Sequence, residues 1–451
     1  MSDTGKMALR KKKPNFFDFR IDLDSSDLDE LFAPYDPLKY HPSDLNPLGS
    51  YGQPYDPIDH TYIRQLMNGA LGDIVDHYFR ARLINKERIP SDGPAILASN
   101  HSGNAFPHDG IVLNALLWRE SIRKKEPRFI RSMYSPKLAK SWWMRAFTVD
   151  DFWRKCGAID QTFVNYDHVL QNGRRLIYYP EGIPGIGKGF NRRYQLQHFY
   201  SSFVVLAARH NAPVIPVYTI NGEWVNPANI TYKWIDRIVD KLLGIPFLPL
   251  PNAIFALIFP FIFYLSFPCN LTYKFGKPIN IREMLREVGC KDVVNPDRAS
   301  VHRVAARVRK HMQPELDQAV DEYGRKPYHC SSLRKHFSQN KGKRWRLLPT
   351  GWPIAFLGSY RNRFRKKPRN RLHALLRDWD FIFFYLPLGW IGLSLCRRFR
   401  KPPYGYRGLS DRQRTLREGS YFWNLDDRPL PAKEKISLKE SPQRQDTVDQ
   451  K

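Results

Sequence analysis

A histidine and an aspartate that could perform acid–base chemistry lie close together after a short apolar run. His101 and Asp109 follow residues 93–99, which begin with a Gly-Pro pair and end in a serine. This pattern predicts a strand, then a loop, then a helix. A histidine held by a carboxylate can accept a proton from a substrate hydroxyl, which typically contributes about 10²–10⁴-fold to the rate. The alternative interpretation is an ordinary loop histidine followed by an aspartate that caps a helix.

A second polar segment follows the apolar, β-rich run at residues 176–179. Glu181 and Gly182 open a glycine-rich loop there, and three cationic residues follow them: Lys188, Arg192 and Arg193. Backbone N–H groups and cationic side chains complement phosphate, so the loop predicts binding of an anion. For the two arginines, a solvated helix face is the alternative. A nucleotide-binding P-loop is disfavoured, because Gly189 stands where magnesium binding needs Ser or Thr.

Together, the two segments resemble the lysophospholipid/glycerol acyltransferase superfamily, whose members carry an Asn-His…Asp box and a Pro-Glu-Gly box. The boxes here lie at residues 100–109 and 180–182, and the resemblance continues through residues 203–208 and 212–217. It covers about residues 56–325 and extends to the bacterial monoacylglycerol and diacylglycerol acyltransferase branch. The resemblance implies that His101 is the general base, that Asp109 fixes its tautomer, and that Glu181 and Gly182 shape the acceptor pocket. Loop N–H groups are then expected to stabilise the oxyanion.

This sequence departs from the family pattern in two places. Seven residues separate His101 from Asp109, whereas the family usually has four, so the role of Asp109 assumes that the extra residues loop out. His108 is an adjacent competitor for that role. Pro184 stands where members with phosphate-bearing acceptors usually carry an arginine. The resemblance therefore leaves the acceptor lipid open.

The resemblance implies transfer of a fatty acyl group from an acyl thioester to a hydroxyl of a glycerolipid or lysophospholipid. The donor would be acyl-CoA or acyl carrier protein, with no metal and no other cofactor. A thiol of pKa near 8.5 leaves without strong acid assistance, so one base can serve the step. A non-catalytic membrane-binding protein on the same scaffold is the main alternative. A metal-dependent hydrolase and a nucleotide-binding protein are further rivals.

Short apolar strands alternate with helical patterns between residues 56 and 326. Strands are expected at residues 95–99, 176–179, 214–218 and 271–275, and amphipathic helices at 61–82 and 300–323. Such alternation predicts an α/β fold with a largely parallel sheet and flanking helices. Three parts are expected: an N-terminal arm (1–55), the acyltransferase domain (56–326) and a C-terminal extension (327–451).

The C-terminal extension is basic and rich in aromatic residues. The chain has 72 Lys and Arg against 44 Asp and Glu, a formal net charge of +28. Between residues 331 and 401, 18 Lys and Arg face only two acidic residues and are interleaved with apolar runs. Cations beside apolar segments favour an anionic membrane surface as partner. Nucleic acid is not expected, because no zinc spacing or RNA-recognition signature accompanies the charge.

Two apolar stretches are predicted to contact the membrane without spanning it. The stretch 252–267 has 16 residues, about 24 Å if helical, against a hydrocarbon core of about 30 Å, and Pro260 interrupts it. The stretch 381–396 contains Pro387 and is followed by basic residues. Both predict interfacial or re-entrant segments, with core helices as the alternative. Five scattered cysteines without paired spacing indicate reduced, mostly buried thiols, so the predicted location is the cytoplasmic face of a membrane.

Overall fold

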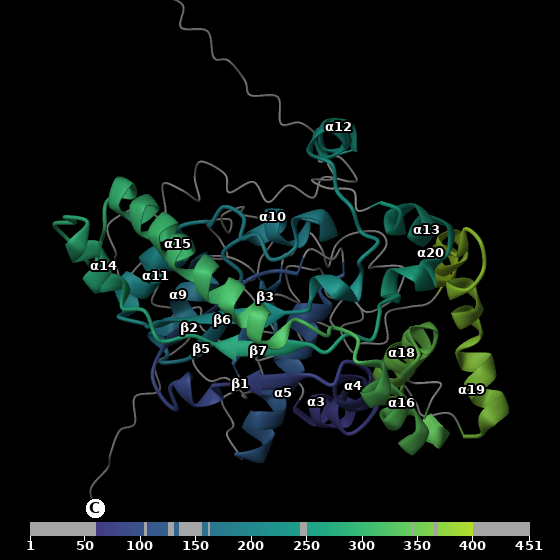
Figure 1. Cartoon of the computed structure of the whole chain (residues 1–451). Helices are drawn as coiled ribbons and strands as arrows, with labels where there is room; N and C mark the ends of the chain where they lie inside the picture. The colour runs from purple at the N-terminus through teal and green to yellow at the C-terminus, as the bar shows by residue number, and fades with distance from the viewer. Residues whose placement is uncertain are drawn as a thin grey trace, which may run out of the picture.

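The computed structural model describes the following residues: 60–102, 106–124, 130–134, 156–160, 163–243, 250–343, 347–364 and 369–399. Their strands form a seven-stranded sheet in the order β1-β7-β6-β2-β5-β3-β4 (Figure 1). The strands are β1 (Arg82–Ile84), β2 (Ala95–Ser99), β3 (Arg131–Tyr134), β4 (Ile159–Asp160), β5 (Arg175–Tyr178), β6 (Val214–Ile220) and β7 (Thr272–Phe275). Every neighbouring pair is parallel except β6 and β7. The predicted α/β fold with a largely parallel sheet is confirmed.

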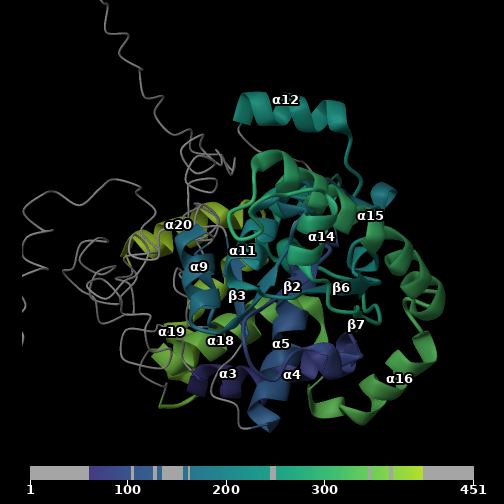
Figure 2. The same cartoon turned by 90° about the vertical axis from the view of Figure 1, so that its left-hand side faces the viewer.

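Helices cover both faces of the sheet, as Figure 2 shows. One face packs against α3 (His60–Met67), α4 (Ala70–Asp73), α5 (His108–Arg123) and α18 (Trp352–Phe364). The other packs against α9 (Phe163–Gln171), α11 (Ser202–His210), α14 (Ile281–Glu287) and α15 (Arg298–Tyr323). Strand residues alternate between these two cores: Leu97 belongs to the first, and Ile96 and Ala98 belong to the second. Because β2 is buried on both faces, its sequence is a continuous run of small and apolar residues.

The region predicted as one helix over residues 61–82 is interrupted in the structure. Helices α3 and α4 are separated at Asn68 and Gly69, and a π-helical turn, η2 (Ile74–Tyr78), follows before β1. The four-residue spacing of apolar side chains marks a buried face but does not report whether the backbone continues. Glycine weakens a helix interior, which explains where the break falls. The amphipathic helix expected at 300–323 is confirmed as α15, with the Asp297 side chain capping its start.

The two apolar stretches are short, interrupted segments that contact each other. The first consists of α13 (Asn252–Ile258) and the 3₁₀ turn η6 (Pro260–Tyr264), and the second of η9 (Trp379–Phe384) and α20 (Gly389–Phe399). The Leu388 N–H donates to the Ile258 carbonyl at 2.7 Å, and the Trp390 indole donates to the Ala256 carbonyl at 2.7 Å. Among the described helices, none combines the length and the apolar character that crossing a bilayer requires.

Residues beyond 326 share a hydrophobic core with the start of the predicted acyltransferase domain. The Trp352 ring packs edge-on against Tyr78 at 5.2 Å, and Tyr360 packs against Tyr62 at 5.8 Å. Helices α16 (Cys330–Gln339) and α19 (Arg371–Arg377) also belong to this extension. The predicted arm (1–55) lies outside the described residues, as do residues 400–451. Four of the five cysteines are buried, as predicted, and Cys330 is exposed.

Candidate active site

The loop after β2 and the first turn of α5 bring His101 and Asp109 together. The Nδ1 atom of His101 lies 3.1 Å from Oδ2 of Asp109, and the Ser102 N–H donates to the same oxygen at 3.1 Å. On the far side of Asp109, the Tyr273 hydroxyl from β7 donates to the Asp109 carbonyl at 2.7 Å. Asp109 therefore does more than begin a helix: its carboxylate contacts the imidazole despite the longer spacing. Residues 103–105, which lie within this longer spacing, are outside the described part of the chain.

The surroundings of Asp109 keep its carboxyl group ionised. Burial alone would raise its pKa, but the His101 imidazole and the N–H groups of Gly110 and Ser102 lower it below the ordinary value. A carboxylate only accepts hydrogen bonds, so the proton on the His101 ring is assigned to Nδ1. This leaves the lone pair on Nε2. His101 is 9% exposed, so its ring is sheltered without being sealed from a substrate.

One aromatic side chain stacks on the His101 ring. The Tyr179 ring, directly after β5, stacks on it with centroids 3.9 Å apart and an angle of 11°. Burial and the nearby Asp109 charge raise the Tyr179 pKa, so its hydroxyl stays neutral. His108 instead lies among the rings of Phe106 and Trp352. Burial lowers the His108 pKa to about 4, which makes it a neutral core residue beside the candidate base.

Glu181 connects the two sequence boxes. It is fully buried, and its Oε1 accepts from the His101 N–H at 2.9 Å while its Oε2 accepts from the Gln197 N–H at 2.7 Å. Gly182 follows with φ +53°, a conformation that favours glycine. Three residues on, a Cβ on Gly185 would come 2.5 Å from the Glu181 Cβ and 3.0 Å from the His101 Cβ. Glycines in this loop thus allow α10 (Gly182–Ile186) to approach the histidine closely.

The three predicted phosphate-binding cations lie in different environments. Lys188 is fully buried, with Nζ 3.2 Å from Oε1 of Glu223 and 3.9 Å from Oε2 of Glu181. Arg192 is half-buried and donates to the Lys188 carbonyl at 2.8 Å and to the Thr231 hydroxyl. Arg193 is exposed, and its guanidinium lies 4.8 Å from the centroid of the Phe190 ring. Of these three, Arg193 is the most exposed and Lys188 is the most buried.

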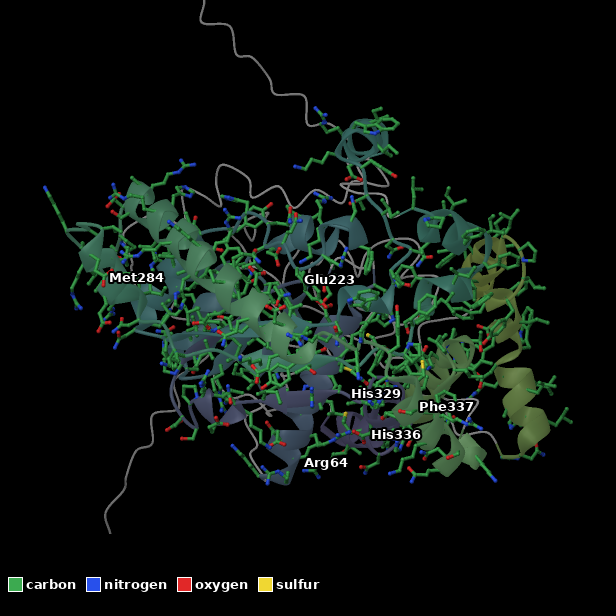
Figure 3. The ribbon with its side chains drawn as sticks, viewed as in Figure 1. Arg64, Glu223, Met284, His329, His336 and Phe337 are labelled. Carbon is green, nitrogen blue, oxygen red and sulfur yellow. The ribbon has the colours of Figure 1, made fainter. Side chains whose placement is uncertain are left out.

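Sequence reasoning missed Glu223, which is 1% exposed and lies toward the middle of the molecule in Figure 3. It lies three residues after the end of β6, as Glu181 lies three residues after β5, and His101 lies two residues after β2. Strands β2, β5 and β6 are parallel neighbours, so their carboxyl ends meet at one edge of the sheet, where ligands bind in open α/β sheets. A search for polar residues just after each predicted strand would have identified Glu223. In the described part of the chain, no three metal-ligating side chains cluster in a way that could hold a metal ion.

Residues 80–220, which include both boxes, match the protein-family model described as Acyltransferase. The chain carries an acyltransferase domain. This match agrees with the acyltransferase resemblance of the two boxes. Uncharacterised proteins of Mycobacterium bovis and Mycobacterium tuberculosis are each 30% identical to this chain over 203 residues, 45% of this chain and 52% of theirs.

An uncharacterised protein of Mycobacterium leprae is 28% identical over 203 residues, covering 45% of this chain and 51% of its own length. The chain thus spans about half the length of the curated relatives it matches. Among solved structures, the chain is similar to the 1-acyl-sn-glycerophosphate (LPA) acyltransferase PlsC from Thermotoga maritima. The TM-score is 0.32 at 14% identity, with 65% of this chain and 88% of that chain covered.

Proposed function

We propose that this protein transfers a fatty acyl group from an acyl thioester to a hydroxyl of a glycerolipid or lysophospholipid. The observation that carries the proposal is the His101 imidazole, whose Nδ1 lies 3.1 Å from the buried Asp109 carboxylate. This contact orients the ring and leaves Nε2 as the base. The pair lies within the acyltransferase domain, at the carboxyl end of β2.

In the proposed step, Nε2 of His101 takes the proton of the acceptor hydroxyl as its oxygen bonds to the thioester carbonyl carbon. The tetrahedral intermediate then collapses, the carbon–sulfur bond breaks, and the imidazolium returns the proton to the departing thiolate. Asp109 stabilises the imidazolium without taking its proton. The N–H groups of His101 and Ser102 both donate to carboxylates. Neither N–H group is free to stabilise the oxyanion, so in the proposed step other groups donate to it.

The proposed co-substrate is acyl-CoA or acyl carrier protein, and the chemistry requires no other cofactor. Both donors carry phosphate on the thioester-bearing group. The exposed Arg193 guanidinium suits contact with such a phosphate, and Arg192 lies next to it along the chain. Gly182 would shape the acceptor pocket through the close approach of α10.

We further propose that the protein acts at an anionic membrane surface, on the cytoplasmic face. Apolar side chains on α13 and α20 are widely exposed, with Leu257 at 57% and Ile391 at 61%. Water-exposed aliphatic groups of this kind gain free energy on entering a bilayer interface. The same surface fits the alternative of a non-catalytic membrane-binding protein, and activity decides between the two.

The test is incubation of the purified protein with labelled acyl-CoA or acyl carrier protein and a panel of lysolipids, monoacylglycerols, diacylglycerols and sterols. Transfer to a glycerolipid is expected for the wild type and for His302→Ala, which changes an exposed histidine of α15. His101→Ala should lose about 10²-fold or more of the rate. Vesicle binding without transfer to any acceptor would support the non-catalytic alternative instead.

A further inference from the structure

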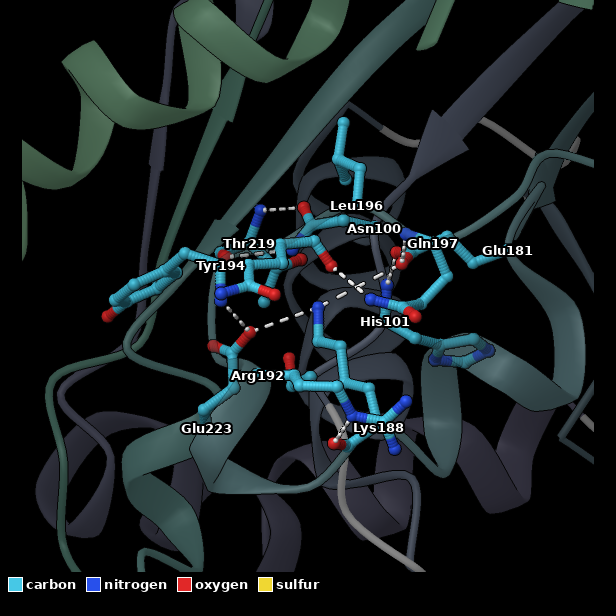
Figure 4. Close-up of polar contacts among 12 residues, drawn as sticks. Asn100, His101, Glu181, Lys188, Arg192, Tyr194, Leu196, Gln197, Thr219 and Glu223 are labelled. Carbon is cyan, nitrogen blue, oxygen red and sulfur yellow. Dashed lines mark hydrogen bonds and ion pairs between the residues drawn. The ribbon is translucent and has the colours of Figure 1, made fainter. Parts of the chain in front are cut away.

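A buried row of charged side chains links the end of β6 to the backbone of His101 (Figure 4). Glu223, Lys188 and Glu181 are exposed by 1%, 0% and 0%, respectively. The Lys188 ammonium lies between the two carboxylates, and Glu181 in turn accepts from the His101 N–H. Leaving a charge unpaired in such an interior is strongly unfavourable. The position of Glu181 therefore depends on Lys188, and that of Lys188 on Glu223.

Two members of this row, Glu223 and Lys188, are held by hydrogen bonds to the segments around them. Oε1 of Glu223 accepts from the Tyr194 N–H at 3.0 Å. The Lys188 carbonyl accepts from the Thr231 hydroxyl at 3.0 Å and from Arg192 at 2.8 Å. The Tyr194–Glu223 and Thr231–Lys188 contacts join segments that are distant in sequence, whereas Arg192 and Lys188 belong to one loop. These contacts build Glu223 and Lys188 into the fold.

The row also carries an unbalanced charge. Burial alone would lower the Lys188 pKa, but Glu181 and Glu223 raise it above the ordinary value, so the ammonium stays charged. The Asp109 charge acts on Lys188 as well. One ammonium therefore stands among three carboxylates, and a second positive charge nearby is favoured. An imidazolium on His101 would supply that charge during proton abstraction.

We propose that Lys188 and Glu223 are positioning residues, which hold Glu181 against the His101 backbone and set the proton affinity of the imidazole. This inference rests on the proposed role of His101 as the base. Lys188 was predicted to contact phosphate, and this inference assigns it a role inside the protein instead. Its ammonium has two carboxylate neighbours and no exposed surface.

The direct test is the pKa of His101 in the full chain, measured by NMR with labelled histidines and assigned by comparison with His101→Ala. Lys188→Met removes a positive charge and should raise this pKa. Glu223→Gln removes a negative charge and should lower it, each by about half a unit or more. Among the described residues, the charged and titratable groups around the ring and along the row include the following: Asp109, Tyr179, Glu181, Lys188, Arg192, Tyr194 and Glu223. Opposite shifts of the His101 pKa distinguish an electrostatic effect from a general loss of packing, because a loss of packing has no reason to shift the pKa in opposite directions in the two variants.

Kinetics supply the second measurement. Each single variant should lower kcat about tenfold with little change in KM for the thioester, and Lys188→Met with Glu223→Gln should cost less than the two losses combined. Lys310→Met, an exposed lysine of α15, is the matched control and should behave as the wild type. If Lys188→Met fails to fold, Glu223→Gln, which keeps the side-chain shape, carries the test alone.

Three outcomes overturn the inference: NMR shifts of the same sign, no shift, or a raised KM with unchanged kcat for Lys188→Met. The last would return Lys188 to phosphate binding. The NMR measurement needs no turnover, so opposite shifts in a chain without acyl transfer would refute the proposed function and leave the electrostatic role intact.

Discussion

At the residue scale, the Asp109 carboxylate is the group on which the orientation of His101 depends. Its Oδ2 faces both the His101 Nδ1 and the Ser102 N–H. Asp109→Asn can present an N–H where an acceptor is required, which favours the wrong tautomer. We expect kcat to fall by about 10²–10⁴-fold. The loss should be smallest for an acceptor alcohol that is easily deprotonated. Steady-state kinetics would measure this loss of kcat, with Asp321→Asn at an exposed position as the control. Wild-type rates for Asp109→Asn would place the base elsewhere.

His108, buried beside this dyad, should make folding sensitive to acid. Its pKa is lowered to about 4 by burial, whereas an unfolded histidine titrates near 6.5. Between these values the unfolded chain binds a proton that the folded chain does not, so stability falls as the pH falls through this window. From pH 7 to pH 5, the loss assigned to this residue is about 2 kcal/mol.

The measurement is urea unfolding of the wild type and His108→Phe at pH 7 and pH 5. Phenylalanine fits the ring cluster around this position, which includes Phe106 and Trp352, and has no proton to bind. The variant should lose less stability than the wild type between the two pH values. Equal losses would show that other groups account for the acid sensitivity.

At the element scale, the short helix α10 is positioned by the absence of a side chain. Gly185→Ala would place a Cβ 2.5 Å from the Glu181 Cβ and 3.0 Å from the His101 Cβ, so α10 or the histidine loop must move. Misplacement by about 1 Å can cost about 10²-fold in rate. We expect a large loss of kcat. Gly358→Ala in α18, where a Cβ meets nothing within 4 Å, should keep full activity. Equal kcat values for the two variants would contradict tight packing at α10.

The elements differ in how much of them the sequence could predict. The bounds of β2 were predicted as they are observed, because a strand buried on both faces is a continuous apolar run between clear breakers. The His101–Asp109 pair was also predicted, from local spacing and the family resemblance. The burial of Lys188 was not, because its partner Glu223 lies 35 residues further on and glycine-rich loops are usually at the surface. Long-range pairing of charges leaves no local pattern in a sequence.

At the scale of the whole molecule, two apolar segments far apart in sequence form one surface. Helices α13 and α20 lie together at one side of the molecule, and α14 and α15 lie at the other (Figure 1). Composition and length predicted that each segment avoids spanning a bilayer, but not that hydrogen bonds join them. Because Leu388 and Trp390 donate to carbonyls of α13, the exposed apolar side chains of both helices lie on neighbouring elements. A single face of this kind suits a flat lipid surface better than two separate anchors would.

Membrane attachment through this α13–α20 surface can be tested by adding one negative charge to it at a time. Leu257→Asp and Ile391→Asp each place a carboxylate on an exposed position, so the fold should be retained. Each should weaken binding to vesicles of anionic lipid about tenfold, because burial of a large aliphatic side chain is worth about 1.5–3 kcal/mol. Ala306→Asp adds the same charge at an exposed position of α15 and should bind as the wild type does. Flotation with vesicles at low and high salt measures both the apolar and the electrostatic contribution to binding. Salt screens the attraction between the basic residues and the anionic lipid. If the two surface variants float with vesicles as fully as Ala306→Asp, the α13–α20 surface does not contact the membrane, and basic residues elsewhere must account for any attachment.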